Sequence, residues 1–560
     1  MQISRMEKIG IVLAALALWA VLAAYAGGPI FSDEMMYLDA SLRNYAEPSY
    51  GNRYFHIYLQ KLFIAIAPAP LTGVRIFWSF LIAMTVTTIY INARTLHPKS
   101  SPLHGLLAAA FFFSFPLITE YSGEPASDVT AMAMVALFVS VYMLALRFPA
   151  HKKVLIMLLG LLAFLSFKTR EITIFINYLL LGFMWDDEGK WSWDRLASII
   201  KPFLIGAAAG IAVFILLDGL ILGDPFFAIS PSTFGSIFQH YQYQDRFYFG
   251  PSSWYREYFL DELTLPFLLF LMSGVKLGSE LHPGRKLLWL YPLILAVFVT
   301  LNMLKITFGF IERFYFPALP LVAMLAPQAI RFDWPQGRRQ WIGFILLIAG
   351  SALAVLLLRQ VMQDHAASMN FDFGRYLNSI FYPMMLSILF MSLIWNNRYT
   401  WATAVLPLVC IGAMLISPLV YTQKYFFRYP KVRQRYDEMF YPFEVNRDAL
   451  EITGDEKLYV SARLDRELEM LSDDPNDIVG MYNFFFDARI SDANVTMGYA
   501  AKTLYGDLTG SRHVYTYALL PASDWALLES NPDWASEIGS IYQVSADPGG
   551  QVFLLERIAK

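Results

Sequence analysis

Cysteine and charge are both scarce in this sequence. Cys410 is its one thiol, and a single cysteine excludes an intrachain disulfide and a thiolate cluster for zinc or an iron–sulfur centre. Charged residues make up 16% of the 560 positions, whereas soluble domains have about a quarter. The net charge of -3 gives no concentrated basic face for phosphates, which excludes nucleic acid as a partner.

Long apolar segments are what the sequence has instead. Hydrophobic residues make up 56% of the chain, and apolar runs long enough to cross a hydrocarbon core of ~30 Å recur up to about residue 420. About thirteen runs are predicted spans: 9–26, 71–92, 103–119, 129–148, 154–167, 172–185, 199–222, 263–277, 287–304, 314–329, 341–358, 376–395 and 401–420. The run 154–167 is short and the run 314–329 contains Pro317 and Pro320, so either is a candidate for a kinked or partial crossing. We expect an α-helical polytopic membrane protein whose first run is a retained helix and not a cleaved signal peptide.

The lysines and arginines near the span ends predict the orientation. They concentrate in alternate connections, at 94–99, 147–153, 285–286 and 331–339, which places these connections and the N-terminus in the cytoplasm. The remaining connections are longer, more aromatic and richer in carboxylates, and they are predicted to lie outside: 27–70, 120–128, 168–171, 223–262, 305–313 and 359–375.

Two domains are expected from the change in hydropathy near Tyr421. Residues 1–420 form the membrane domain, with an amphipathic first outer loop at 27–70. Residues 421–560 are expected to form a small extracytoplasmic α/β domain. Its predicted strands are 457–461, 513–519, 542–545 and 552–556, and its predicted helices are 463–471 and 525–529.

An acidic pair directly follows the first span. Asp33 and Glu34 come after Ser32, with Tyr37 about one turn further on. Adjacent carboxylates are costly to hold beside hydrocarbon, so they are candidates for chemistry, although a capped, solvated helix start has the same pattern. The loop that follows alternates aromatic and basic residues as interfacial helices do.

Further charged clusters lie on the same predicted face. Glu124 and Asp128 precede the fourth span, where the capped outer end of a helix would have the same pattern. Lys168, Arg170 and Glu171 interrupt an otherwise apolar stretch. Cations at this depth suit capture of a phosphate better than packing.

Two further outer elements combine arginine with aromatic residues. Arg246 lies in the aromatic loop 223–262, which suits sugar stacking and phosphate binding as well as an ordinary interfacial belt. Arg313 and Tyr315 begin the span that contains Pro317, where a guanidinium either meets a lipid phosphate or snorkels to the interface.

Together these features resemble the membrane-embedded GT-C glycosyltransferases, in particular lipid A aminoarabinose transferases and protein O-mannosyltransferases. The resemblance implies an inverting enzyme in a bacterial inner membrane. It would move a sugar from a polyprenyl-phosphate donor to a glycan, lipid or protein acceptor of the cell envelope, lipopolysaccharide included, on the periplasmic side. No nucleotide, metal or other cofactor is implied, because the leaving group is already a charged phosphate.

The same resemblance assigns roles to residues. Asp33 is the implied general base, with Glu34 as the other candidate, and Glu124 orients the acceptor or the base. The residues implied to hold the donor phosphate are Lys168, Arg170, Arg313 and Arg246. Those implied to contact acceptor or sugar are Tyr37, Asp128, Glu171 and Tyr315.

Other functions remain open from the sequence. A multi-span transporter of an amphipathic or anionic envelope precursor also buries charged residues, but it usually has two related halves, and no such symmetry is found. A membrane assembly protein and a polymer ligase that takes a lipid-linked glycan are further alternatives. The enzyme hypothesis predicts that Asp33, Glu124, Lys168 and Arg313 line one cavity.

Overall fold

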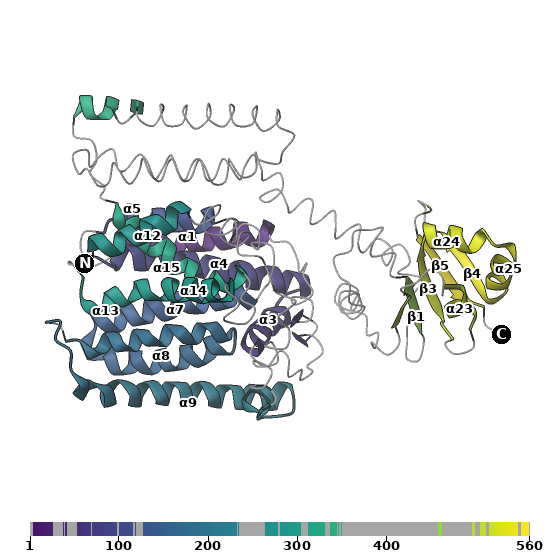
Figure 1. Ribbon diagram of the computed structural model, residues 1–560, viewed down its shortest axis with the longest axis horizontal. Coiled ribbons are helices and arrows are strands. Elements are labelled where there is room, and N and C mark those ends of the chain that lie inside the picture. Colours follow the sequence, from purple (N-terminus) through teal and green to yellow (C-terminus); the bar gives the residue numbers. More distant parts are fainter. Residues whose placement is uncertain are drawn as a thin grey trace. The chain divides into compact units, whose positions relative to one another are not determined.

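The computed structural model is mostly helical (Figure 1). It describes residues 4–25, 37–38, 40–41, 53–68, 70–97, 100–115, 118, 127–186, 188–231, 233, 264–277, 281–303, 312–330, 337–343, 345–346, 349, 457–461, 495–498, 504–510, 514–546, 550 and 552–558. Its contacts divide the chain into two compact units. The first comprises 1–26, 44–59 and 75–426, and the second comprises 27–43, 60–74 and 427–560.

Apolar helices make up the first ten predicted spans. They are α1 Arg5–Tyr25, α4 Pro70–Thr95, α5 Pro102–Ser114, α7 Ser127–Arg147, α8 Lys152–Phe167, η3 Glu171–Met184, α9 Leu196–Ile221, α12 Thr264–Leu277, α14 Leu290–Met303 and the broken segment of η9 Glu312–Ala318, α15 Leu319–Leu325 and η10 Ala326–Ala329. Among the described residues, five helices are long and apolar enough to cross a membrane. The chain is therefore a multi-pass membrane protein. The predicted spans 376–395 and 401–420 and most of 341–358 lie outside the described residues, so the total of about thirteen stays a prediction.

Two of these segments depart from regular α-helix. The helix η3 is 3₁₀ over 14 residues, and at a rise of about 2.0 Å per residue it reaches about 28 Å, where an α-helix of that length would reach about 21 Å. The segment 312–329 changes from 3₁₀ to α and back, with Pro317 inside η9. The expectation of an interrupted helix there is confirmed. The helix is interrupted because proline lacks the N–H that a continuous helix needs.

The helix α8 packs against α7 on one side and against α9 on the other (Figure 1). Glycines bring α8 and α9 into close contact: a Cβ on Gly160 would lie 1.9 Å from the carbonyl oxygen of Phe203, and one on Gly206 would lie 1.7 Å from that of Met157. Small residues at such a crossing let two backbones approach within a membrane, where dispersion replaces the hydrophobic effect as the driving force.

The ends of these helices form two polar layers. The layer at 127–130, 168–171 and 218–222 is called the Arg170 face below, and the layer at 94–104, 147–152, 185–196 and 282–286 is called the Arg285 face. Because α7 has 21 residues, the two faces are about 30 Å apart, close to the thickness of a hydrocarbon core.

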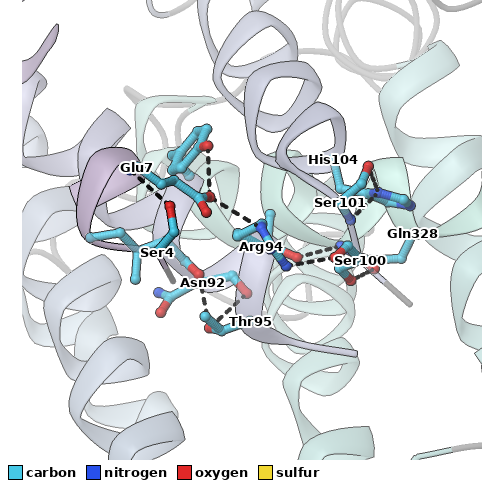
Figure 2. A network of polar contacts seen from close by, with 12 residues as sticks. Ser4, Glu7, Asn92, Arg94, Thr95, Ser100, Ser101, His104 and Gln328 are labelled. Atoms are coloured by element: carbon cyan, nitrogen blue, oxygen red, sulfur yellow. Dashed lines mark hydrogen bonds and ion pairs between the residues drawn. The ribbon is translucent and has the colours of Figure 1, made fainter. Parts of the chain in front are cut away.

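A buried polar network ties several helix ends together at the Arg285 face (Figure 2). The Arg94 guanidinium contacts Glu7 Oε1 at 3.1 Å and donates to the carbonyl oxygen of Ser100 at 2.6 Å. The Ser100 hydroxyl donates to Gln328 Oε1 at 2.8 Å, and the Gln328 amide donates to the carbonyl oxygen of Ala93. These bonds connect α1, α4, the start of α5 and η10, and they satisfy polar groups that burial would otherwise leave unpaired.

The C-terminal part of the chain contains a five-stranded mixed sheet in the order β2-β1-β3-β5-β4. The elements are β1 Leu458–Ser461, β2 Val495–Gly498, β3 Tyr517–Pro521, β4 Tyr542–Ala546 and β5 Val552–Arg557, with helices α23 Leu504–Thr509, α24 Ala522–Glu529 and α25 Pro532–Ile541. The strand β1 is parallel to β2 and β3, whereas β5 is antiparallel to β3 and β4.

The sheet and its helices enclose an aromatic and aliphatic core that includes Tyr459, Tyr515 and Leu555. The predicted strand at 457–461 and the hairpin at 542–556 are present, while the predicted helix 463–471 lies outside the described residues. A separate extracytoplasmic domain at 421–560 stays a prediction.

Candidate functional site

A short helix of the predicted first outer loop reaches the Arg170 face. This helix, α3 (Tyr54–Ile66), was expected from alternating apolar and polar residues, and Tyr54, Ile57 and Tyr58 are buried. Tyr54 packs edge-on against Phe227 with ring centroids 4.9 Å apart. The Phe55 N–H donates to the carbonyl oxygen of Lys168 at 3.2 Å. The amphipathic pattern thus predicts the helix α3, and the apolar side of α3 packs against the ends of α8 and α9.

Two ion pairs connect this layer. The Arg170 guanidinium contacts Asp128 Oδ2 at 2.5 Å, and both side chains are almost completely buried. Arg53, just before α3, donates to Glu171 Oε1 at 2.9 Å. The pairs join the start of α7, the segment 168–171 and the start of α3, so residues far apart in the sequence meet at one depth.

A third set of bonds centres on Asp218 in the last turn of α9. The Tyr58 hydroxyl donates to Asp218 Oδ1 at 2.5 Å, and the Ala228 N–H donates to Asp218 Oδ2 at 2.8 Å. The Lys168 ammonium donates to the carbonyl oxygen of Ala228. Burial lowers the pKa of Lys168 to about 8, against the opposing attraction of Asp218 and Glu171. The chain of bonds fixes the ammonium beside the Arg170 segment.

Histidine and serine side chains complete the layer. His56 Nδ1 lies 2.8 Å from the Thr130 hydroxyl, which joins α3 to α7. The hydroxyls of Ser127 and Ser166 are buried and have no hydrogen-bond partner among the described residues. Buried hydroxyls without a partner are uncommon in folded proteins.

The charged groups that these ion pairs and hydrogen bonds connect are three cations and three carboxylates. The cations are Arg53, Lys168 and Arg170, and the carboxylates are Asp128, Glu171 and Asp218. A neutral set of pairs can lie at the edge of a hydrocarbon core, where a bare charge would be costly. The carboxylates hold the cations in place, and net attraction for an anion requires further positive charge.

The structure brings together four of the predicted site residues, Lys168, Arg170, Asp128 and Glu171. Tyr315 is buried, and its hydroxyl donates to the carbonyl oxygen of Pro292 at 3.2 Å.

The remaining predicted residues are Tyr37 and five whose side chains the structure does not describe. Tyr37 belongs to the second unit, where its carbonyl oxygen accepts a bond from Ser41. Asp33, Glu34, Glu124, Arg246 and the side chain of Arg313 lie outside the described residues. The expectation that one cavity contains Asp33, Glu124, Lys168 and Arg313 therefore stays a prediction.

Asp218 was not among the site residues predicted from the sequence, although its carboxylate accepts two hydrogen bonds in the structure. Asp218 is a lone acidic residue within the predicted span 199–222, and an ionisable residue in an apolar run is itself a signal of a functional or structural partner. Arg53, His56 and Tyr58 were recognised as parts of an amphipathic pattern but were not assigned to the site. Their partners could not be found from spacing, because each lies 70 or more residues away along the chain.

Comparisons with known proteins support the fold. No family model matches the sequence, and no curated protein matches it. ArnT from Cupriavidus metallidurans bound to undecaprenyl phosphate superposes with a TM-score of 0.54 at 16% identity, covering 99% of this chain and 98% of ArnT. Its apo state gives a TM-score of 0.54 at 15% identity, with 98% of each chain covered. The oligosaccharyltransferase AglB from Archaeoglobus fulgidus gives a TM-score of 0.43 at 11% identity, covering 99% of this chain and 75% of AglB.

The predicted resemblance is therefore confirmed at the level of fold, since ArnT is a lipid A aminoarabinose transferase of the GT-C group. The similarity extends over nearly the full length of both chains, so it includes the C-terminal part as well as the membrane helices. This chain has the fold seen in ArnT.

Proposed function

We propose that this protein is a glycosyltransferase that transfers a sugar from a polyprenyl-phosphate donor to an acceptor of the cell envelope. The observation that supports this most is the shared fold with ArnT, whose structure holds undecaprenyl phosphate. A second support is the position of Lys168 and Arg170, which the predicted span order places at the outer end of the membrane. The proposed setting is a bacterial inner membrane, with the N-terminus cytoplasmic and residues 421–560 periplasmic.

The proposed reaction is an inverting displacement. The acceptor hydroxyl oxygen bonds to the anomeric carbon as the bond from that carbon to the phosphate oxygen breaks. The hydroxyl proton passes to a carboxylate, for which Asp33 is the candidate and Glu34 the alternative, while Glu124 orients the acceptor. The leaving polyprenyl phosphate gains one negative charge, so fixed cations around it lower the barrier.

The described layer supplies part of that cationic environment. In the proposed complex Lys168 and Arg170 contact the donor phosphate, and Arg313 and Arg246 add positive charge beyond that of the paired groups. Asp128 and Glu171 hold the cations in position and, with Tyr37 and Tyr315, are the proposed contacts to acceptor and sugar. The proposed scheme uses no metal or other cofactor, because the donor is already activated by its phosphate.

The experiment is transfer in detergent from a set of synthetic polyprenyl-phosphate sugars. It compares the wild-type chain with Asp33→Asn, Glu34→Gln and Lys168→Gln, and with Lys153→Gln as the matched control. Lys153 is an exposed lysine of α8 at the Arg285 face, so the control removes the same charge from the opposite end of the same helix. Each variant is first checked for a monodisperse elution profile.

Loss of turnover in Asp33→Asn with donor binding retained would support the general-base assignment. Weaker donor binding by Lys168→Gln, with turnover and donor binding unchanged in Lys153→Gln, would support the assignment of Lys168 to the donor phosphate. Near wild-type turnover in both Asp33→Asn and Glu34→Gln would show that the base is elsewhere. If no donor is bound or consumed, the glycosyltransferase proposal is wrong.

A further inference from the structure

The Arg285 face contains a cavity of about 410 Å³ at which several helices end. It lies at the end of α7 opposite the Asp128–Arg170 pair, and the length of α7 separates the two by about 30 Å. The cavity is therefore distinct from the candidate donor site. The lining residues that matter here are Lys152, Trp185, Asp186, Arg195, His282 and Arg285.

The lining of this cavity carries an excess of positive charge. Lys152, Arg195 and Arg285 are cations and Asp186 is the one carboxylate of the lining, which leaves an excess of two positive charges. His282 adds none: its Nδ1 accepts a bond from the Gly284 N–H at 3.1 Å, so Nε2 carries the hydrogen that is donated to the carbonyl oxygen of Asp186. The charges that line this cavity therefore do not balance.

The Asp186 carboxylate is engaged by a turn and offsets only one of the three positive charges of the lining. Its Oδ1 accepts the Lys190 N–H at 2.7 Å, and its Oδ2 lies 3.8 Å from the Arg195 guanidinium, beyond hydrogen-bond length. The Arg285 guanidinium is fixed by a bond to the carbonyl oxygen of Leu96 at 2.6 Å. Burial and the neighbouring Arg147 guanidinium lower the pKa of Arg285, which reflects cations gathered in a partly desolvated space.

Tryptophans beside the cavity indicate its depth in the membrane. Trp185 packs edge-on against Trp191 at 4.5 Å, and Trp191 packs against Trp193 at 5.3 Å. Trp193 is 67% exposed although it lies at the start of an apolar helix. Exposed tryptophans next to spanning helices are typical of the headgroup level of a bilayer. Lipid phosphates lie at that level, and basic pockets between helix ends bind them.

We propose that this cavity binds the phosphate group of an anionic ligand, and that an anionic membrane lipid of the leaflet at the Arg285 face supplies it. Two guanidinium groups and one ammonium group around a space of this size suit a phosphate with exposed oxygens, since charge-assisted bonds to phosphate are among the stronger polar contacts. The inference does not depend on the glycosyltransferase proposal, because the residues and the face are different.

The test is native mass spectrometry of the full-length protein in detergent. It is titrated with dioctanoyl phosphatidic acid, with dioctanoyl phosphatidylcholine and with inorganic phosphate. The variants are Lys152→Gln and Arg195→Gln, and the matched control is Lys153→Gln, the exposed neighbour that does not line the cavity. Each variant is used after its melting temperature has been shown to match that of the wild type.

We expect one saturable phosphatidic acid site that binds much more tightly than phosphatidylcholine. Each cavity variant should weaken it about tenfold, and the control should leave it within about twofold. If inorganic phosphate binds as tightly as phosphatidic acid and shows the same losses, the phosphate site stands and the lipid source is wrong. Equal binding of phosphatidylcholine and phosphatidic acid, or equal effects of Lys153→Gln and the cavity variants, would overturn the proposal.

Discussion

The buried pair of Asp128 and Arg170 makes the strongest energetic prediction of this structure. Its atoms lie 2.5 Å apart, and the two side chains are 2% and 5% exposed. Removing one partner of such a pair leaves a poorly solvated charge, which typically costs about 3–5 kcal/mol, whereas replacing both by apolar groups is often close to neutral. We expect Asp128→Leu and Arg170→Met each to destabilise the fold by about 3–5 kcal/mol. The double variant should lie within about 2 kcal/mol of the wild type.

Equilibrium unfolding in mixed micelles of increasing SDS content measures these free energies, and the three variants with the wild type form a double-mutant cycle. Additive single effects, with a double variant as unstable as their sum, would refute the reasoning. The cycle also separates structure from function. Because the proposed role of Arg170 is to contact the donor phosphate, the double variant should recover stability without recovering transfer. Recovery of both would show that Arg170 is structural alone.

Three further predictions concern other contacts. Gly206→Ala should separate α8 from α9 and lower the unfolding temperature in detergent, because its Cβ would lie 1.7 Å from a carbonyl oxygen of α8, whereas Gly10→Ala meets no atom within 4 Å and should have no such effect. Tyr58→Phe should cost about 1–3 kcal/mol in the same SDS titration by removing a donor from buried Asp218, and an unchanged midpoint would contradict the contact. Since the pKa of Lys168 is lowered to about 8, its ammonium is lost as the pH rises through that value, so the Kd for polyprenyl phosphate should increase above pH 8 in binding titrations. Lys168→Arg should move this increase to higher pH, and identical profiles would exclude Lys168 as the group responsible.

The sequence by itself determined the membrane helices and the secondary structure around the site. Apolar runs of this length are stable in a bilayer and not in water, so the positions of the spans could be predicted from hydropathy. Each of the first ten predicted spans falls on a helix of the structure. The prolines at 317 and 320 predicted an interrupted helix for the same local reason, and the amphipathic pattern predicted α3. Lys168, Arg170, Asp128 and Glu171 could be selected because charges at the end of an apolar run need partners.

The tertiary structure alone decided which partners those charges have. Hydropathy carries no information on which helix ends are neighbours, so Asp128 with Arg170, Arg53 with Glu171 and Tyr58 with Asp218 could not be paired from spacing. Hydropathy likewise does not distinguish a 3₁₀-helix from an α-helix, and the 14 residues of η3 are 3₁₀ in the structure. The cavity at the Arg285 face depends on several separate segments, whose basic residues taken one by one are ordinary for the ends of membrane spans. Their excess charge arises only when the fold places them around one space.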